Sequence, residues 1–240
     1  MKDSLGDRMK DFYEDRAKYY LPRRTYTLIR IDGKAFHTYT KGLPRPFDLD
    51  LVDDMDETAK FLCKNIQGAK CAFVQSDEIS IVLTDFEKTT TDAWFDGNVQ
   101  KIASISSSIA TAKFNELRPG KLAFFDSRCF TITSETEVIN YFIWRQQDTV
   151  RNSISSVAQS EFSSKQLHGV KTDGMQEMLF TQKGINWNDF DPKLKRGRMI
   201  VKEQYEKAGA IRNRWVSVAP PTFTQDRDYI RDMIKVKETE

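Results

Sequence analysis

The sequence predicts an α+β fold: a palm-like, ferredoxin-like split β-α-β antiparallel sheet flanked by helices, with a helical and basic C-terminal extension. Two observations predict it. Apolar patterns of strand and helix period follow one another in the order strand, helix, strand, strand, helix, strand over residues 25–132. The chain of 240 residues is 39% hydrophobic and 12% aromatic, which provides enough apolar surface for a core and excludes a disordered protein.

The first half of the chain supplies the elements of the split sheet. We expect, in order, a helix at 4–19, a strand at 25–31, a helix at 49–66, strands at 71–75 and 79–84, a helix at 91–116 and a strand at 122–132. Leu51, Met55 and Leu62 recur at helical spacing within the second helix. Residues 76–78 are polar and separate two β-rich runs, which is typical of a hairpin. Proline and glycine at 119–120 end the long helix.

The second half is expected to be helical at 134–160 and 172–182, with a further pair of strands at 197–203 and 212–219. We therefore divide the chain into a core at 1–133 and an extension at 134–240 that together form one compact unit. The extension holds a basic stretch at 193–214, with eight cations against two glutamates. Such a stretch indicates either a polyanionic partner or a solvated face.

Several classes of protein are excluded by what the sequence lacks. Cys63, Cys71 and Cys129 are odd in number and have no C-x-x-C spacing, which argues against a disulfide framework and a zinc site. No apolar run approaches the roughly 18 residues of a membrane span, and the first twenty residues lack the apolar centre of a signal peptide. Neither common nucleotide-binding glycine motif is present. We expect a cytoplasmic protein without membrane contact.

Acidic residues stand where the predicted topology brings two strand ends together. Asp32 closes the first strand, and Asp77 with Glu78 occupies the turn before the third strand. The first and third strands of a split β-α-β sheet are antiparallel neighbours, so these carboxylates should converge. Oxygen ligands without histidine or cysteine suit Mg²⁺. Either stretch alone is also typical of an ordinary turn.

The residues after Asp32 fit a phosphate site. Gly33 has no Cβ to prevent its carbonyl from approaching an ion, and the amides after Lys34 could face phosphate oxygens. His37 and His168 are the two histidines of the chain, which gives little support to a histidine acid–base mechanism. His37 alone, beside Phe36, is more typical of a packed or capping residue than of a ligand.

Four stretches closely resemble the signature motifs of the histidine-tRNA guanylyltransferase family, in the family's order. They are residues 30–37 (RIDGKAFH), 75–80 (QSDEIS), 125–128 (FDSR) and 144–148 (WRQQD). The resemblance implies a palm-like catalytic core at 1–133 that adds nucleotides to RNA in the 3′-to-5′ direction, with tRNA and nucleoside triphosphates as partners. It implies two Mg²⁺ ions, ATP and GTP or other nucleotides as substrates, and a homotetramer.

The resemblance also assigns residues to roles. It implies metal ligation by Asp32, the Gly33 carbonyl and Asp77, with Asp32, Asp77 and Glu78 as catalytic residues. It implies a nucleotide site formed by Asp32, Gly33, Lys34, Ala35, Phe36, His37, Arg45, Asp48, Ser76, Asp77 and Asn152. Glu78 either assists an ion or orients its neighbours. For tRNA we expect phosphate contacts from Lys193, Lys195, Arg196, Arg198, Lys202, Arg212 and Arg214.

One departure from the family bears on the reaction. Eukaryotic members follow W-R-Q-x-D with a histidine- and asparagine-rich stretch, whereas residues 149–156 read TVRNSISS, and Asn152 alone keeps a motif side chain. This version looks like the guanylyltransferase-like branch of bacteria and archaea, associated with template-dependent repair of 5′-truncated tRNA. The alternatives are a strict histidine-tRNA guanylyltransferase, a palm-domain nucleotide cyclase and a non-catalytic tRNA-binding module.

Overall fold

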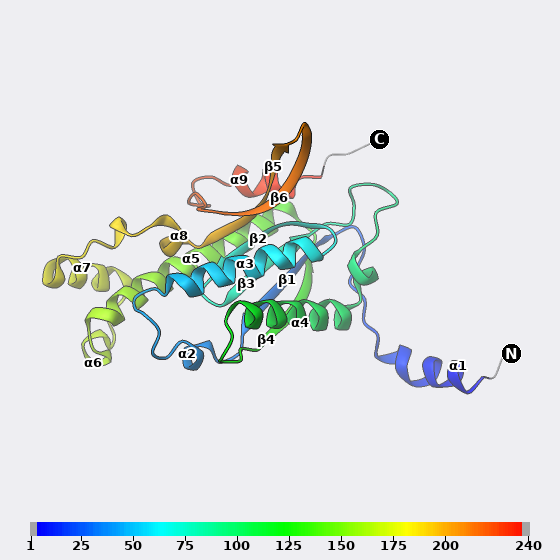
Figure 1. Cartoon of the computed structure of the whole chain (residues 1–240), viewed down its shortest axis with the longest axis horizontal. Helices are drawn as coiled ribbons and strands as arrows, with labels where there is room; N and C mark the ends of the chain where they lie inside the picture. The colour runs from blue at the N-terminus through cyan, green and yellow to red at the C-terminus, as the bar shows by residue number, and fades with distance from the viewer. Residues whose placement is uncertain (1–3, 237–240) are drawn as a thin grey trace.

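The computed structural model describes residues 4–236. Its centre is a six-stranded sheet in the order β4-β1-β3-β2-β5-β6, in which every neighbouring pair is antiparallel (Figure 1). The strands are β1 (Tyr26–Gly33), β2 (Ala69–Gln75), β3 (Glu78–Leu83), β4 (Phe125–Ile132), β5 (Arg198–Lys207) and β6 (Ala210–Val218). The predicted α+β class is confirmed, and β1 lies beside β3 as the split β-α-β order requires.

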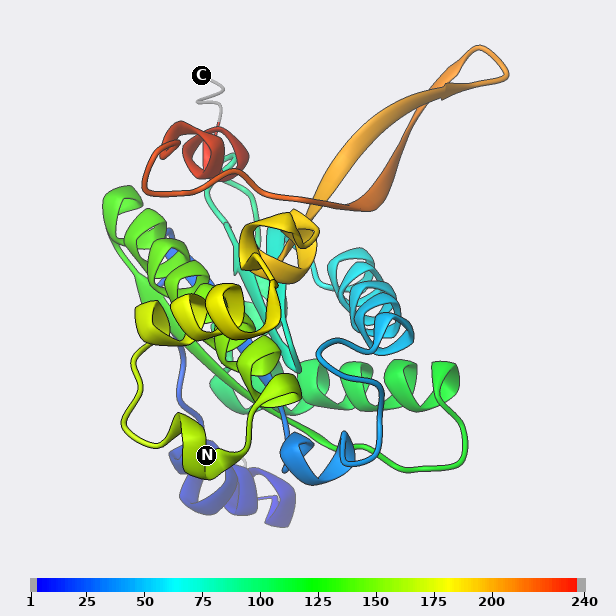
Figure 2. The same ribbon diagram turned by 90° about the vertical axis from the view of Figure 1, so that its left-hand side faces the viewer.

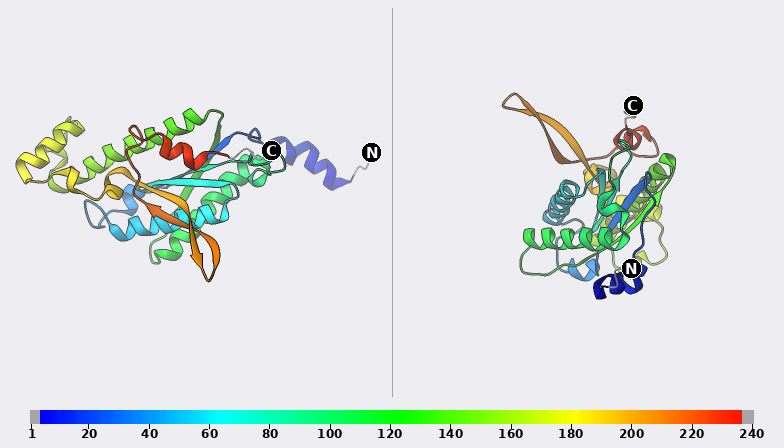
Figure 3. Two further views of the ribbon diagram at one scale, coloured as in Figure 1. Left: turned by 90° about the horizontal axis from the view of Figure 1, so that it is seen from above. Right: turned by 90° about the vertical axis from the view of Figure 1, so that its right-hand side faces the viewer.

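Helices cover both faces of this sheet. The longer ones are α3 (Leu49–Asn65), α4 (Val99–Leu117), α5 (Glu135–Glu161) and α7 (Thr172–Lys183). Shorter helices are α1 (Leu5–Met9), η1 (Lys10–Glu14), η2 (Asp15–Ala17), α2 (Phe36–Tyr39), η3 (Trp94–Gly97), α6 (Ser164–Leu167), η4 (Trp187–Asp189), α8 (Pro192–Arg196) and α9 (Asp228–Ile234). The three segments from α1 to η2 bury no residue, and they extend away from the rest of the chain (Figure 3).

The alternation of side chains along the strands assigns each helix to a face. Ile29 and Ile31 of β1 pack with buried residues of α3 and α4. Leu28, one position away, packs on the opposite face with buried residues of α5 and α9. Successive side chains of a strand point to opposite faces of the sheet. Because helices cover both faces of this sheet, the side chains on both faces must be apolar. A third cluster, around Val157, joins the end of α5 to α6 and α7.

The helix predicted at 91–116 begins later in the structure, at Val99. Asn98 caps it, since its side chain accepts a hydrogen bond from the Lys101 amide at 3.0 Å. Before this cap, Phe95 and Asp96 have left-handed backbone angles that no helix continues through. The strand predicted from 122 likewise begins later, at Phe125, so residues 122–124 remain a connection.

The strands predicted at 197–203 and 212–219 form one long hairpin. In the structure these strands are β5, which continues to Lys207, and β6, which begins at Ala210. Ala208 and Gly209 join them, with φ angles of 53° and 72°. Two successive positive φ angles are the geometry of the tight hairpin turn that follows the twist of the strands. The sequence prediction ended early because the outer half of the hairpin is polar. That half leaves the sheet and projects from the molecule (Figure 2).

Candidate active site at the ends of β1 and β3

Two carboxylates meet where β1 ends and β3 begins. Asp32 pairs in register with Glu78, and the Gly33 amide donates a hydrogen bond to the Asp77 carbonyl at 3.1 Å. Asp32 and Asp77 are both partly buried. Burial and, after it, the nearby charge of Asp32 raise the pKa of Asp77 from its ordinary 3.8 to about 6. A cation between the carboxylates would relieve this repulsion.

The residues present fit a hard cation. Both side chains offer oxygen ligands, and the pKa of Asp77 is raised first by burial and then by the nearby charge of Asp32. Within residues 4–236 no group of three aspartate, glutamate, histidine or cysteine side chains could hold a metal ion. An ion here would therefore need backbone, water or substrate oxygens besides the two carboxylates.

The chain after Asp32 makes a compact turn. A Cβ built on Gly33 would lie 2.2 Å from the Phe36 ring, so only glycine permits this ring to pack where it does. Phe36 is buried against Phe114 and Phe125. Lys34, Ala35 and His37 are exposed, and so is Ser76, on the turn before Asp77. The expected nucleotide-site residues of the two turns thus gather at one edge of the sheet, apart from Phe36, which belongs to the core.

Glu78 has surroundings different from those of a free metal ligand. It is 4% exposed, and its two oxygens accept hydrogen bonds from Arg145 of α5 at 2.7 and 2.8 Å. Arg30 of β1 approaches the same carboxylate at 2.6 Å. Ser80 donates to it as well, at 3.3 Å. Of the two roles left open by the sequence, the contacts favour orientation of neighbours over ligation.

The stretch 144–148 lies on α5 and connects the sheet to several parts of the chain. Arg145 also donates to Asp148 at 2.9 Å, and its guanidinium lies over the half-exposed Trp144 ring. Gln146 donates to the Pro221 carbonyl and accepts from the Phe223 amide, both at 2.8 Å, so it fixes the C-terminal segment. Asn152, one turn further, is exposed and donates weakly to Asp148 at 3.5 Å.

Arg45 and Asp48, which we expect at the nucleotide site, lie in the loop before α3. Asp48 caps that helix by accepting a hydrogen bond from the Leu51 amide at 2.8 Å, and Arg118 lies 3.8 Å from its carboxylate. Asp48 therefore has a structural role that its motif position did not reveal. Arg45 is exposed.

The basic stretch does not form one surface, which corrects the sequence expectation for two residues. Arg198 is 3% exposed and pairs with the buried Asp56 at 2.7 Å. Lys195 is 9% exposed, donates to the Asn188 carbonyl and lies over the Trp187 ring. Arg198 is interior because it is the first residue of β5, within the sheet. Lys195 is interior because it lies on α8, directly before that strand. Lys202, Arg212 and Arg214 remain exposed on the hairpin.

One acidic residue near the site was missed. Asp126 of β4 pairs in register with Asp32, so the two side chains share a face of the sheet. It is exposed and lies 3.3 Å from Arg128. The signal was available in the FDSR stretch, but placing it beside Asp32 requires knowing that β4 pairs with β1 rather than with another strand.

Comparisons with known proteins match the chain to one family. A family model described as tRNAHis guanylyltransferase, Thg1, matches residues 6–133. The tRNA(His) guanylyltransferase of Saccharomyces cerevisiae is 30% identical over 74% of this chain and 83% of its own length. An uncharacterized protein of Acanthamoeba polyphaga mimivirus is 27% identical over 98% of this chain and 89% of its own.

Solved structures extend the likeness to the whole chain. A bacterial tRNA(HIS) guanylyltransferase (Thg1)-like protein in complex with ATP is 48% identical, with a TM-score of 0.91 over 98% of this chain and 100% of that one. The corresponding complex with GTP has a TM-score of 0.86 over 97% and 99%. The crystal structure of the S. cerevisiae guanylyltransferase has a TM-score of 0.67 at 26% identity, over 79% and 91%.

The fold and the paired carboxylates define a nucleotidyltransferase. More particularly, the family model covers more than half of the chain, and the chain belongs to the tRNAHis guanylyltransferase (Thg1) family. In the part of the chain that the structure describes, no helix is both long and apolar enough for a membrane crossing.

Proposed function

We propose that this protein adds nucleotides to the 5′ end of truncated tRNA in the 3′-to-5′ direction, with the opposing strand as template. The observation that carries the proposal is the sequence of α5 after Asp148, where Asn152 alone keeps a side chain of the eukaryotic motif. The 48% identity to bacterial proteins named guanylyltransferase-like, over nearly the whole chain, supports the same branch. Strict guanylate addition to histidine tRNA is the alternative, favoured by the description of the family model.

We assign the metal site to residues of the two turns. Asp32, the Gly33 carbonyl and Asp77 would hold Mg²⁺, two ions by family resemblance. Such ions supply charge stabilisation for the attacking and leaving oxygens of phosphoryl transfer. Glu78 holds the turn against α5 through Arg145, so we assign it a positioning role rather than ligation.

ATP and GTP are bound by the bacterial relatives according to their descriptions, and we propose nucleoside triphosphates as substrates here. The exposed residues of the two turns, with Arg45, Asp48 and Asn152, form the proposed nucleotide site. Lys34 provides a positive charge at the edge where Asp32 and Asp77 meet. The Gly33 and Lys34 amides already donate to the Asp77 and Phe124 carbonyls, so we assign the amides of Ala35 and Phe36 as further donors for phosphate oxygens.

Two displacements at phosphorus complete the proposed reaction. In the first, a 5′-monophosphate oxygen of the RNA attacks the α-phosphorus of ATP and pyrophosphate leaves, which forms a 5′-5′ pyrophosphate bridge. In the second, the 3′-hydroxyl of the incoming nucleotide attacks the RNA 5′-phosphorus, loses its proton and displaces AMP. No side-chain nucleophile is required. Cys63 and Cys71 are fully enclosed, and burial raises the pKa of the Cys71 thiol to about 12.

Further parts of the proposal rest on resemblance and composition. The core at 1–133 is assigned to catalysis, while the extension at 134–240 contributes to tRNA binding and places Asn152 at the nucleotide site. Exposed cations of the hairpin, with Lys193 and Arg196, provide phosphate contacts. A homotetramer is expected from the family, and three free cysteines support a cytoplasmic location.

The deciding experiment uses tRNAs that lack their first 5′ nucleotide, with the opposing base changed to each of the four. With Mg²⁺, ATP and all four nucleotides, the added nucleotide should be the complement in each case, and addition should stop when the acceptor stem is complete. Product length and identity are read by gel and sequencing. Addition of G whatever the opposing base, confined to histidine tRNA, would establish the strict guanylyltransferase instead.

A further inference from the structure

The root of the β5–β6 hairpin opens a gap in the sheet. β5 pairs with β2 only from Ala72 to Val74, opposite Ile200 to Arg198. Beyond these pairs β5 continues outward with β6, whereas β2 continues back to Ala69. A cavity therefore lies on each side of the hairpin root, one toward α9 and one toward α3 and α4.

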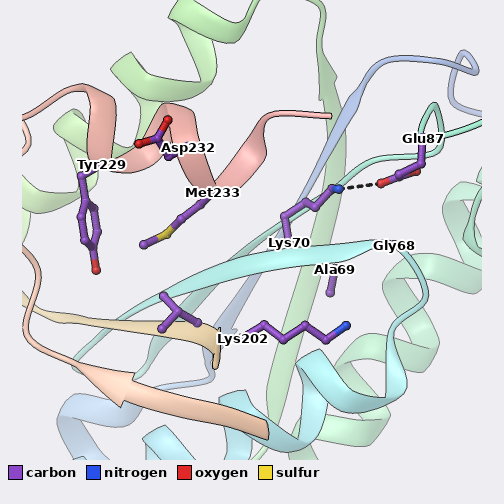
Figure 4. Close-up of a pocket in the computed structure, with 9 residues that line it drawn as sticks. Gly68, Ala69, Lys70, Glu87, Lys202, Tyr229, Asp232 and Met233 are labelled. Carbon is purple, nitrogen blue, oxygen red and sulfur yellow. Dashed lines mark ion pairs between the residues drawn. The ribbon is translucent and has the colours of Figure 1, made fainter. Parts of the chain in front are cut away.

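The cavity toward α9 has a volume of about 720 Å³ and carries charges of both signs. Lys70 is paired with Glu87 at 2.8 Å, and Asp232 lies on the opposite wall (Figure 4). Lys202 extends from β5 toward Ala69 in the same view. Two lysines against two carboxylates give this cavity no preference for an anion.

The cavity toward α3 and α4 has a volume of about 650 Å³ and a different character; we call it the hairpin-root groove. Its charged lining consists of five cations and a single carboxylate: Lys60, Lys64, Lys113, Lys202, Arg214 and Glu57. Three of the cations have an ion-pair partner within 3.1 Å. In residues 4–236, Lys64 and Lys202 have no carboxylate partner, and both are exposed. The groove is therefore positive, with two ammonium groups available to a ligand.

Aromatic rings lie between these cations. Phe61 of α3 is 38% exposed, and Lys113 lies 5.5 Å from its centroid. Trp215 of β6 is partly buried, with Lys202 at 5.8 Å from its ring. Exposed ammonium groups beside aromatic rings are the pattern that binds single-stranded nucleic acid, because cations contact phosphates while bases stack on aromatic rings. The lysines that lie over Phe61 and Trp215 have flexible side chains, which would leave the rings when they contact phosphates. A duplex offers no free base faces to such rings.

We propose that the hairpin-root groove binds single-stranded RNA, and that in the substrate this segment is the unpaired 3′ end of the tRNA. The inference rests on the proposed function, since it takes tRNA as the substrate. The groove lies at the Ala69 end of β2, about 20 Å along the strand from the catalytic turn at roughly 3.3 Å per residue. The unpaired 3′ end starts beside the 5′ end of the acceptor stem. Four stacked nucleotides cover roughly 14 Å, and unstacking extends them further.

The test measures binding without nucleotides, so that it does not depend on catalysis or on template direction. Two fluorescent tRNAs that both lack the first 5′ nucleotide are compared, one with its unpaired 3′ end and one trimmed to the end of the stem. Lys64→Ala/Lys202→Ala should weaken binding of the untrimmed tRNA about tenfold at low salt and reduce the slope of log K against log salt by about 1.4, the value for two single-strand phosphate contacts. Binding of the trimmed tRNA should be unchanged.

Lys165→Ala/Lys171→Ala is the matched control, because it removes two exposed lysines from α6 and the start of α7. It should affect the two tRNAs equally or not at all. The inference is overturned if the groove variant loses the same factor on both tRNAs, which would indicate duplex contacts, or if it binds both like wild type. Failure of templated addition in the earlier experiment would leave these binding results unaffected, so the two proposals fail separately.

Discussion

Asp32 and Asp77 are separated by 45 positions in sequence, and their proximity is a consequence of strand register. β1 and β3 run antiparallel, so the last residues of one meet the first residues of the other. Glu78 follows Asp77 directly, yet it lies within the sheet and its carboxylate is enclosed by arginines. Adjacent acidic residues thus have opposite electrostatic surroundings: Asp77 faces another carboxylate, and Glu78 faces two cations.

Asp77→Asn should abolish nucleotide addition and also stabilise the metal-free protein. Loss of one ligand is expected to cost about 4 kcal/mol of transition-state stabilisation, about a thousandfold in rate. Ionising Asp77 in the folded state costs free energy because burial raises its pKa to about 6. Wild type therefore matches the variant below about pH 4, loses stability between about pH 4 and pH 6, and remains less stable above pH 6, by about 1–2 kcal/mol after allowance for partial exposure.

Thermal unfolding in EDTA between pH 4 and 8 measures this difference, and added Mg²⁺ should stabilise wild type but not the variant. Equal midpoints at pH 8 in EDTA would contradict the electrostatic account. Residual activity above about a tenth of wild type would contradict the role of Asp77 in the reaction.

At the level of elements, α5 connects the catalytic edge to the rest of the chain. Arg145 reaches β3 through Glu78, and Gln146 fixes the segment around Pro221 and Phe223. Tyr141 meets Ser80 of β3 at 2.8 Å. A single helix thus determines how the turn carrying Asp77 sits relative to the C-terminal segment.

Glu78→Gln should destabilise the protein by about 3–5 kcal/mol, because it leaves the buried Arg145 and the partly buried Arg30 without their shared carboxylate. Urea unfolding monitored by circular dichroism gives the value. Glu78→Gln/Arg145→Met, which also removes a buried charge, should recover part of the loss. If Glu78→Gln unfolds like wild type and only activity is lost, Glu78 acts directly in the reaction and the positioning role is wrong.

Arg198→Met and Arg212→Ala should distinguish a buried arginine that stabilises the fold from an exposed arginine that binds tRNA. Arg198→Met leaves Asp56 buried without its cation, and we expect a loss of about 3 kcal/mol in unfolding free energy. Arg212 is exposed on the hairpin, so its removal should change stability by less than about 0.5 kcal/mol and weaken tRNA binding. Chemical unfolding and filter binding, applied to both variants, give the two quantities. Weak tRNA binding by a fully stable Arg198→Met variant would contradict this assignment.

The sequence predicted most elements because their apolar patterns are regular, and it predicted that the strand ends carrying Asp32 and Asp77 lie together because topology determines it. It did not predict the start of α4, where apolar residues such as Phe95 continue the helical pattern through left-handed backbone. It also could not show that Arg198 is buried. That depends on Asp56, 142 positions away, and charge counts along the chain carry no information about such distant partners.

At the scale of the whole molecule, the hairpin projects from the compact body of the protein (Figure 2). Its outer half contacts mainly its own partner strand, from Glu203 opposite Arg214 to the turn at Ala208 and Gly209. A polar ribbon held in this way contributes little to the core and presents its side chains to a partner.

Replacing residues 204–213 with Asn-Gly, which joins Glu203 to Arg214 by a two-residue turn, should therefore leave the body of the protein intact. We expect a thermal midpoint within about 2 °C of wild type, since no core residue is removed. Binding of ATP should be unchanged, while tRNA affinity should fall and depend less on salt. Calorimetry measures the binding of ATP, and fluorescence anisotropy measures the binding of tRNA. Unchanged tRNA affinity would exclude the outer hairpin from the tRNA-binding surface.

The position of β5 beside β2 also has a consequence for synthesis on the ribosome. The edge of β2 that receives β5 is complete at Gln75, but Arg198 and its neighbours are translated more than a hundred residues later. At about 5–20 residues per second, this edge waits roughly 6–25 s for its partner. During that interval the nascent sheet, which has four strands once β4 is complete at Ile132, presents Ala72, Phe73 and Val74 along an unpaired border. Aggregation during synthesis, and protection by chaperones, should therefore concentrate at this border.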